Sequence, residues 1–150
     1  HGNKIKFLRF SPHTSLKELE NQIAEVISKY NIKRVCIDPI SMFFLTMDSP
    51  SKIRETIYEL TSLLKRMKAT VILSNEEIYE PNVDLVRVVE RGEAIEFLTD
   101  GVMMLHSMGL GGAADRAIRI IKMRRTNHVR GPVDFYIHDQ GVEVGKVGKR

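Results

Sequence analysis

The sequence contains one cysteine, no long apolar run and no glycine-rich phosphate loop, and each absence excludes a class of protein. A single thiol, Cys36, permits no internal disulfide, but 150 residues are enough to bury a core without one. Cys36 stands in the apolar run "RVCIDPI", so we expect a buried, reduced thiol. No stretch approaches the roughly 18 apolar residues of a membrane span, and no signal peptide is visible, so we expect a cytoplasmic protein without membrane contact.

The missing phosphate loop matters most for function. The pattern G-x-x-x-x-G-K-[ST], whose backbone N–H groups cradle nucleotide phosphates, does not occur. The run "GVEVGKV" at 141–147 has three residues between its glycines and a valine after its lysine. We therefore expect this chain alone to bind ATP poorly, because nothing else supplies a row of N–H donors and a lysine.

Positive charge is concentrated in one part of the chain. The formal net charge is only +4, yet residues 115–130 hold six Lys or Arg and one acidic residue. Such a stretch favours an anionic partner. The five histidines are scattered with no pair at metal-ligand spacing, which argues against a zinc site.

Periodicity in the first half predicts alternating strands and helices. We expect strands at 4–10, 33–40 and 69–75, a helix over about 16–30, and a second helix that follows Pro50. Ser15 and Glu18 have the spacing of a capping box at the start of the first helix. The runs at 33–40 and 69–75 are almost continuously apolar, which is typical of strands buried on both faces of a parallel sheet.

The second half changes character. Residues 76–98 are polar, with a short helix expected near their end, and strands are expected at 101–108, 116–125 and 133–139. A turn at Gly141 leads into a last short strand. This meander is expected to complete the sheet, which predicts an α/β fold in a single domain over residues 1–150.

Two polar groups follow the two buried strands. Asp38 closes the run "RVCID", and Ser74 follows the run at 69–75. Ligands of open α/β sheets bind at the carboxyl ends of strands, where a lone carboxylate can hold a hydrated Mg²⁺. A turn or helix cap at Asp38, and ordinary loop polarity at Ser74, are the alternatives.

Two cations stand together on the strand expected at 116–125. Lys122 and Arg124 are two residues apart, so they point to the same face of a regular strand. A guanidinium fork beside an ammonium suits phosphate oxygens. The alternative is a solvated edge strand, where such charges discourage aggregation.

Taken in order, these pieces resemble the KaiC-like branch of the RecA superfamily of P-loop ATPases. "KRVCIDPISMFF" resembles the Walker B strand, "LLKRMKATVILSNE" the next helix and strand, and "EFLTDGV" the family segment E-F-x-x-D-x-V. The most specific match is Lys-x-Arg-x-[ST]-x-His with a glycine three residues later. It falls on Lys122, Arg124, Thr126, His128 and Gly131.

The resemblance implies a RecA-like partial core, the C-terminal portion of an ATPase domain that uses ATP and Mg²⁺. Asp38 would be the Walker B carboxylate that binds Mg²⁺ through water, and Ser74 would stand near the sensor position. Lys122 and Arg124 would act on the nucleotide of a neighbouring subunit. Thr126 and His128 would line the same cleft between subunits, and the chain would self-associate, commonly as a ring.

Two other readings remain open from the residues alone. The stretch from Arg116 to Arg130 is also compatible with a non-enzymatic nucleic-acid-binding module, although few aromatic residues accompany it. A catalytically inactive homologue could instead regulate active relatives by supplying Lys122 and Arg124 to them. Under the family resemblance, this sequence acts as an ATPase only in the context of an upstream P-loop and is inactive by itself. The loop "SMGLGGAAD" is a further candidate contact for nucleic acid.

Overall fold

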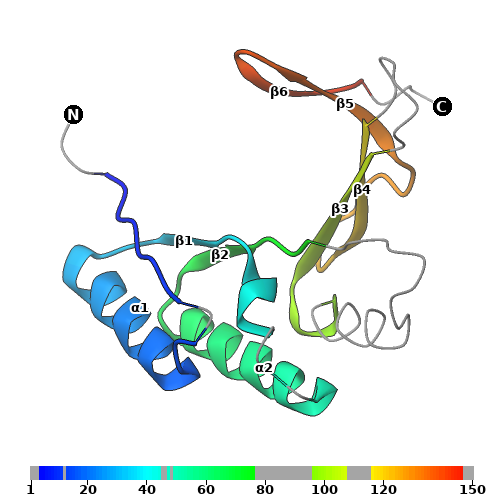
Figure 1. The fold of residues 1–150 in the computed structure, drawn as a ribbon. Coiled ribbons are helices and arrows are strands. Elements are labelled where there is room, and N and C mark those ends of the chain that lie inside the picture. Colours follow the sequence, from blue (N-terminus) through cyan, green and yellow to red (C-terminus); the bar gives the residue numbers. More distant parts are fainter. Residues whose placement is uncertain are drawn as a thin grey trace. The chain divides into compact units, whose positions relative to one another are not determined.

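The computed structural model describes residues 4–11, 13–44, 47, 49–76, 96–107 and 116–146, which belong to two compact units divided after Leu98. Figure 1 shows both units. The first unit holds parallel strands with a crossover helix, and the second holds an antiparallel meander. This confirms the predicted α/β class. The single-domain organisation over residues 1–150 stays a prediction.

Helix α1 spans Leu16–Tyr30, as its apolar spacing predicts. The Ser15 hydroxyl accepts a hydrogen bond from the Glu18 backbone N–H at 3.2 Å, which is one half of the predicted capping box. The Glu18 carboxylate instead accepts from Gln22 Nε2, also at 3.2 Å. Asn31 caps the C-terminal end of the helix, and its left-handed φ of 51° suits a short polar side chain.

Strand β1 (Arg34–Ile37) leads through the 3₁₀ helix η1 (Ile40–Phe44) and helix α2 (Pro50–Arg66) to strand β2 (Thr70–Leu73). Ser49 caps α2 by accepting from the Lys52 backbone N–H at 3.3 Å, and Pro50 occupies the first turn, where no N–H partner is needed. The two strands pair in parallel from Arg34↔Thr70 to Ile37↔Leu73. The predicted strands are therefore confirmed as neighbours, although both are shorter than expected.

Both helices cover the same face of the β1–β2 pair, as Figure 1 shows. The core contains side chains that are at most 6% exposed: Leu19, Ile23, Ile27, Ile40, Phe44, Ile53, Ile57, Leu60 and Leu64. Val35, Ile37, Val71 and Leu73 face this core from the strands.

The opposite face of the pair carries exposed side chains and is called the open face below. Cys36 is exposed and Ile72 is 65% exposed. The predictions of strands buried on both faces and of a buried thiol at Cys36 are therefore wrong for the described residues. The two runs are apolar, but among the described residues no element packs on their second face, so those side chains stay exposed.

Residues 4–10 are described without a strand, so the strand predicted there is also wrong. A strand needs a hydrogen-bonded neighbour, and β1 is paired only with β2 among the described residues. Phe7 is 86% exposed, while the Lys6 ammonium lies 4.3 Å from the centre of the Tyr30 ring on α1. This contact is a cation–π interaction, which holds the segment near α1 without a ladder.

The second unit is a four-stranded antiparallel sheet in the order β3-β4-β5-β6. The strands span Gly101–Ser107, Arg116–Met123, Val133–His138 and Gly141–Val144, which confirms the four predicted strands. The meander was expected to complete the parallel sheet. Among the described residues it is a sheet of its own.

A bulge in β4 decides which side chains share a face. Val102 pairs with Lys122 and Met103 pairs with Ile120, so Ile121 has no partner in the register. An extra residue on one strand inverts the alternation beyond it. Lys122 therefore lies on the face of Arg119, and not on the face of Ile118 and Ile120.

Candidate functional site

The first group of candidate residues lies at the carboxyl end of the β1–β2 pair. Asp38 follows β1 directly and Ser74 follows β2 directly. The Ser74 N–H donates to the Ile37 carbonyl at 3.0 Å, and the Ser74 carbonyl accepts from the Ile40 N–H at 2.8 Å. These two backbone bonds hold Ser74 against the residues that come before and after Asp38. This agrees with the prediction that the two strands are neighbours.

The two side chains are in contact. The Ser74 hydroxyl donates a hydrogen bond to Oδ1 of Asp38. Asp38 is exposed, and the peptide bond that joins it to Pro39 is cis. The bond to Ser74 orients the carboxylate and leaves Oδ2 as an acceptor for water.

This arrangement suits a hard cation such as Mg²⁺, which prefers oxygen ligands and keeps much of its hydration shell. Within the part of the chain that the structure describes, no group of three or more His, Cys, Asp or Glu side chains could hold a metal ion. A single carboxylate such as that of Asp38 has the chemistry to contact a hydrated cation through water. Asn75 and Glu76 follow on the same exposed segment.

The second group lies in the second unit, at the end of β4. Lys122 is half-buried on β4, and Arg124 follows the strand in a turn. The Arg124 backbone N–H donates to the Asp100 carbonyl at 2.8 Å, which extends the β3–β4 ladder by one step. Since Asp100 is two residues from Val102, the partner of Lys122, the backbone positions of Lys122 and Arg124 share one face. The prediction of a shared face agrees with this register.

Arg124 also has an acidic neighbour. Its Nη1 lies 3.4 Å from Oδ1 of Asp100, and the two side chains are 47% and 66% exposed. An ion pair with this exposure contributes roughly 0–1 kcal/mol, because water screens both charges. An incoming phosphate can therefore compete with Asp100 for the guanidinium at small cost.

Thr126 and His128 follow on the same segment. Thr126 is exposed and His128 is half-buried. Nδ1 of His128 lies 3.0 Å from the Val129 carbonyl oxygen, a position that suits an Nδ1–H donor. That tautomer keeps Nε2 as a hydrogen-bond acceptor toward a ligand.

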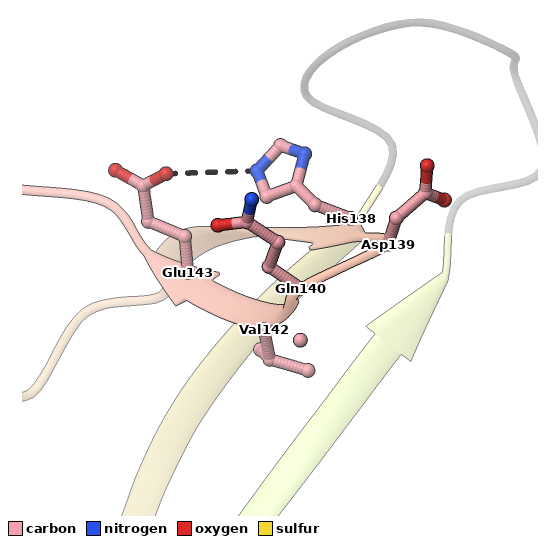
Figure 2. A pocket seen from close by; sticks show the side chains of 6 residues that line it. His138, Asp139, Gln140, Val142 and Glu143 are labelled. Atoms are coloured by element: carbon pink, nitrogen blue, oxygen red, sulfur yellow. Dashed lines mark ion pairs between the residues drawn. The ribbon is translucent and has the colours of Figure 1, made fainter.

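A shallow hollow at the β5–β6 turn contains none of the predicted site residues. His138, Asp139, Gln140, Gly141, Val142 and Glu143 line it. Figure 2 shows Glu143 and His138 facing each other across this hairpin, with Nε2 and Oε2 3.5 Å apart. The His138 side chain is 55% exposed and the Glu143 side chain is 74% exposed, so both are open to solvent.

Sequence reasoning missed Asp100 and the bulge at Ile121. The doubled apolar residue in "RIIKM" breaks strict alternation, and this was the available signal for a bulge. Asp100 stands in the quoted segment "EFLTDGV", but its pairing with Arg124 depends on the register of β3 and β4. The candidate loop "SMGLGGAAD" lies outside the described residues apart from its first residue, Ser107.

Comparison with protein families gives one match across almost the whole chain. The family model described as "ATPase: KaiC" matches residues 3–149.

Curated relatives agree with this match. The circadian clock oscillator protein KaiC of Acaryochloris marina is 32% identical over 133 residues, which are 89% of this chain and 24% of that protein. The protein of the same name from Synechococcus elongatus is 31% identical over 133 residues, again 89% of this chain and 25% of the relative. That of Parathermosynechococcus lividus is 30% identical over 138 residues, 92% of this chain and 25% of the relative. The chain thus spans about a quarter of the length of these relatives.

Proposed function

Because the chain belongs to the KaiC ATPase family, we propose that it is the C-terminal portion of an ATP-binding and ATP-hydrolysing domain that works between subunits. The observation that carries the proposal is the pair of polar groups at separate strand ends. Asp38 with Ser74 forms one group, and Lys122 with Arg124 forms the other. Each has the chemistry that one side of a bound Mg·ATP requires.

The Asp38 group serves the metal side. Ser74 holds the carboxylate by one hydrogen bond, and the exposed carboxylate accepts from metal-bound water. When bound, Mg²⁺ neutralises charge on the phosphate oxygens. The role of Ser74 in this proposal is to position Asp38, which sharpens the sensor role that the family resemblance implies.

The Lys122 group serves the phosphate side of a neighbouring subunit. Lys122 offers a compact charge and Arg124 a planar fork, and their shared face lets both address one phosphate chain. Charge that develops on the phosphoryl group during transfer is stabilised by such preorganised cations. Thr126 and His128 line the same cleft with a hydroxyl and a ring nitrogen. Self-association is then a condition of hydrolysis, and a ring satisfies it for every subunit.

Complementation between two inactive variants tests the action between subunits. In the full-length gene product, Asp38→Asn and Lys122→Ala should each lose most ATP turnover. Mixing them should restore part of it, because some interfaces then combine an intact Asp38 with an intact Lys122. Lys146→Ala, which removes an exposed charge beyond β6, is the matched control and should keep wild-type turnover. Two variants that stay inactive after mixing and exchange of subunits would refute action between subunits.

A regulatory homologue that supplies Lys122 and Arg124 to active relatives is the second candidate. In that case the 150-residue chain, added to an active member of the family, should change its ATP turnover. The Lys122→Ala chain should have no such effect. The comparisons lend no support to the nucleic-acid alternative.

A further inference from the structure

A third cation lies on the face of β4 that carries Lys122. Arg119 pairs with Met104, Lys122 pairs with Val102, and the Arg124 N–H bonds to the Asp100 carbonyl. On β3 these partners are two residues apart each time, so all three cations belong to one face. In an unbroken β4, Arg119 would lie on the opposite face from Lys122, so the bulge at Ile121 is what aligns them.

The spacing of the three side chains follows from strand geometry. Two residues of a strand span about 6.5 to 7 Å, so the three cations occupy about 13 Å along the sheet. Lysine and arginine side chains are long and flexible enough to converge over that span. We propose that Arg119, Lys122 and Arg124 form a row that binds a linear polyphosphate, with Arg119 as its third contact. This β4 cation row rests on the proposed function, which uses only Lys122 and Arg124.

Acidic residues that the structure describes lie near the two ends of the row. Asp100 lies opposite Arg124 and is its exposed ion-pair partner. Asp134 pairs with Ala117 on the far side of Arg119, and Glu143 on β6 contacts His138. Arg119 is exposed and has no ion-pair partner among the described residues. Among the described residues, the register thus places three cations along this face, with Asp100 beside Arg124 at one end and Asp134 beyond Arg119 at the other.

The spacing of the three cations along one face favours a chain of phosphates over a single one. A lone phosphate can satisfy one or two of these donors, whereas successive phosphates can meet a guanidinium, an ammonium and a second guanidinium in turn. The triphosphate of a nucleotide and a free polyphosphate share this chemistry. The row therefore recognises phosphate chain length and not the base or sugar.

A titration of the isolated 150-residue chain tests the row without any turnover assay. Backbone amide NMR spectra are recorded with inorganic tripolyphosphate, orthophosphate or magnesium-free ATP at low and physiological salt. We expect tripolyphosphate and ATP to shift β4 resonances alike, and orthophosphate to act more weakly. Arg119→Ala and Lys122→Ala should each weaken tripolyphosphate binding by about three- to tenfold. Arg125→Gly removes a neighbouring charge in the turn and relieves its positive φ of 59°, so it is the matched control and should change affinity less than twofold.

The outcomes separate this inference from the proposed function. The row would be overturned if Arg119→Ala lost no affinity for tripolyphosphate, or lost no more than Arg125→Gly. In either case, a loss of affinity in Lys122→Ala would still support the phosphate contact of the proposed function. No shift on β4 with tripolyphosphate would also overturn the row. Stronger binding of single-stranded DNA than of tripolyphosphate would replace the polyphosphate with a nucleic acid. Dispersed amide spectra of each variant confirm that the sheet is intact.

Discussion

At the scale of single residues, the contact between Ser74 and Asp38 joins side chains 36 positions apart in the sequence. In the proposed function Asp38 supplies the negative charge and Ser74 only positions it through one hydrogen bond. The two residues should therefore contribute unequally to ATP hydrolysis by the full-length protein. Asp38→Asn removes the charge and should raise the activation free energy by about 2 to 4 kcal/mol. Ser74→Ala removes one charge-assisted hydrogen bond and should raise it by about 1 to 2 kcal/mol.

Steady-state ATP turnover across a magnesium titration measures both effects. The magnesium concentration for half-maximal turnover should rise in Asp38→Asn more than in Ser74→Ala. Wild-type turnover in Asp38→Asn would show that this carboxylate only closes a turn.

Asp100 gives a second residue-scale prediction, which concerns stability. Its ion pair with Arg124 is exposed on both sides, so Asp100→Asn should lower the free energy of unfolding by at most about 1 kcal/mol. The backbone bond from the Arg124 N–H to the Asp100 carbonyl does not depend on the side chain and should survive. Urea unfolding at low and high salt measures the difference, which should shrink as salt rises. A loss of several kcal/mol would mean that the pair is buried in solution.

At the scale of elements, both long helices begin with a serine cap. The Ser15 and Ser49 hydroxyls accept from the N–H groups of Glu18 and Lys52. Ser15→Ala and Ser49→Ala should each lower stability by about 1 kcal/mol, since each leaves a first-turn donor to water alone. Chemical denaturation monitored by circular dichroism at 222 nm (a helix signal) checks this. Substitution to glycine is the control, because it should cost only a few tenths of a kcal/mol.

The two faces of the β1–β2 pair provide another element-scale prediction. Leu60 of α2 is fully buried in the core, whereas Ile72 of β2 is 65% exposed on the open face. Leu60→Ala should therefore cost about 2 to 5 kcal/mol. Ile72→Ala should cost less than about 1 kcal/mol, because little apolar surface is returned to water. Comparable losses in urea unfolding would indicate that the open face is covered in solution.

Local patterns in the sequence predicted the helices and most of the strands. The apolar spacing from Leu16 to Tyr30 and the serine caps are properties of short segments, so they can be read without a fold. The strand at 4–10 failed because a strand depends on a neighbour that no local pattern specifies. Contact between Asp38 and Ser74 could be predicted, because parallel neighbours bring their ends together. The Asp100–Arg124 pair could not, because a one-residue bulge sets its register.

At the scale of the whole molecule, the proposed function assigns this chain residues on two sides of a nucleotide, and the chain has no phosphate-loop pattern. The isolated 150-residue chain should therefore bind Mg·ATP far more weakly than a complete domain of the family. Isothermal titration calorimetry should detect no micromolar binding, because a phosphate loop supplies most of the donors to the phosphates. Inorganic tripolyphosphate at millimolar concentration is the positive control, because it should bind the β4 cation row. Micromolar affinity of the isolated chain for Mg·ATP would contradict the proposal that the phosphate loop lies outside these 150 residues.

The open face of the β1–β2 pair makes the chain easy to tag. Cys36 is its sole thiol and is exposed on that face, two positions before Asp38. A maleimide fluorophore should therefore attach at one defined place without any engineered cysteine. Its emission would then report, in real time, whatever comes to cover that side of the strands.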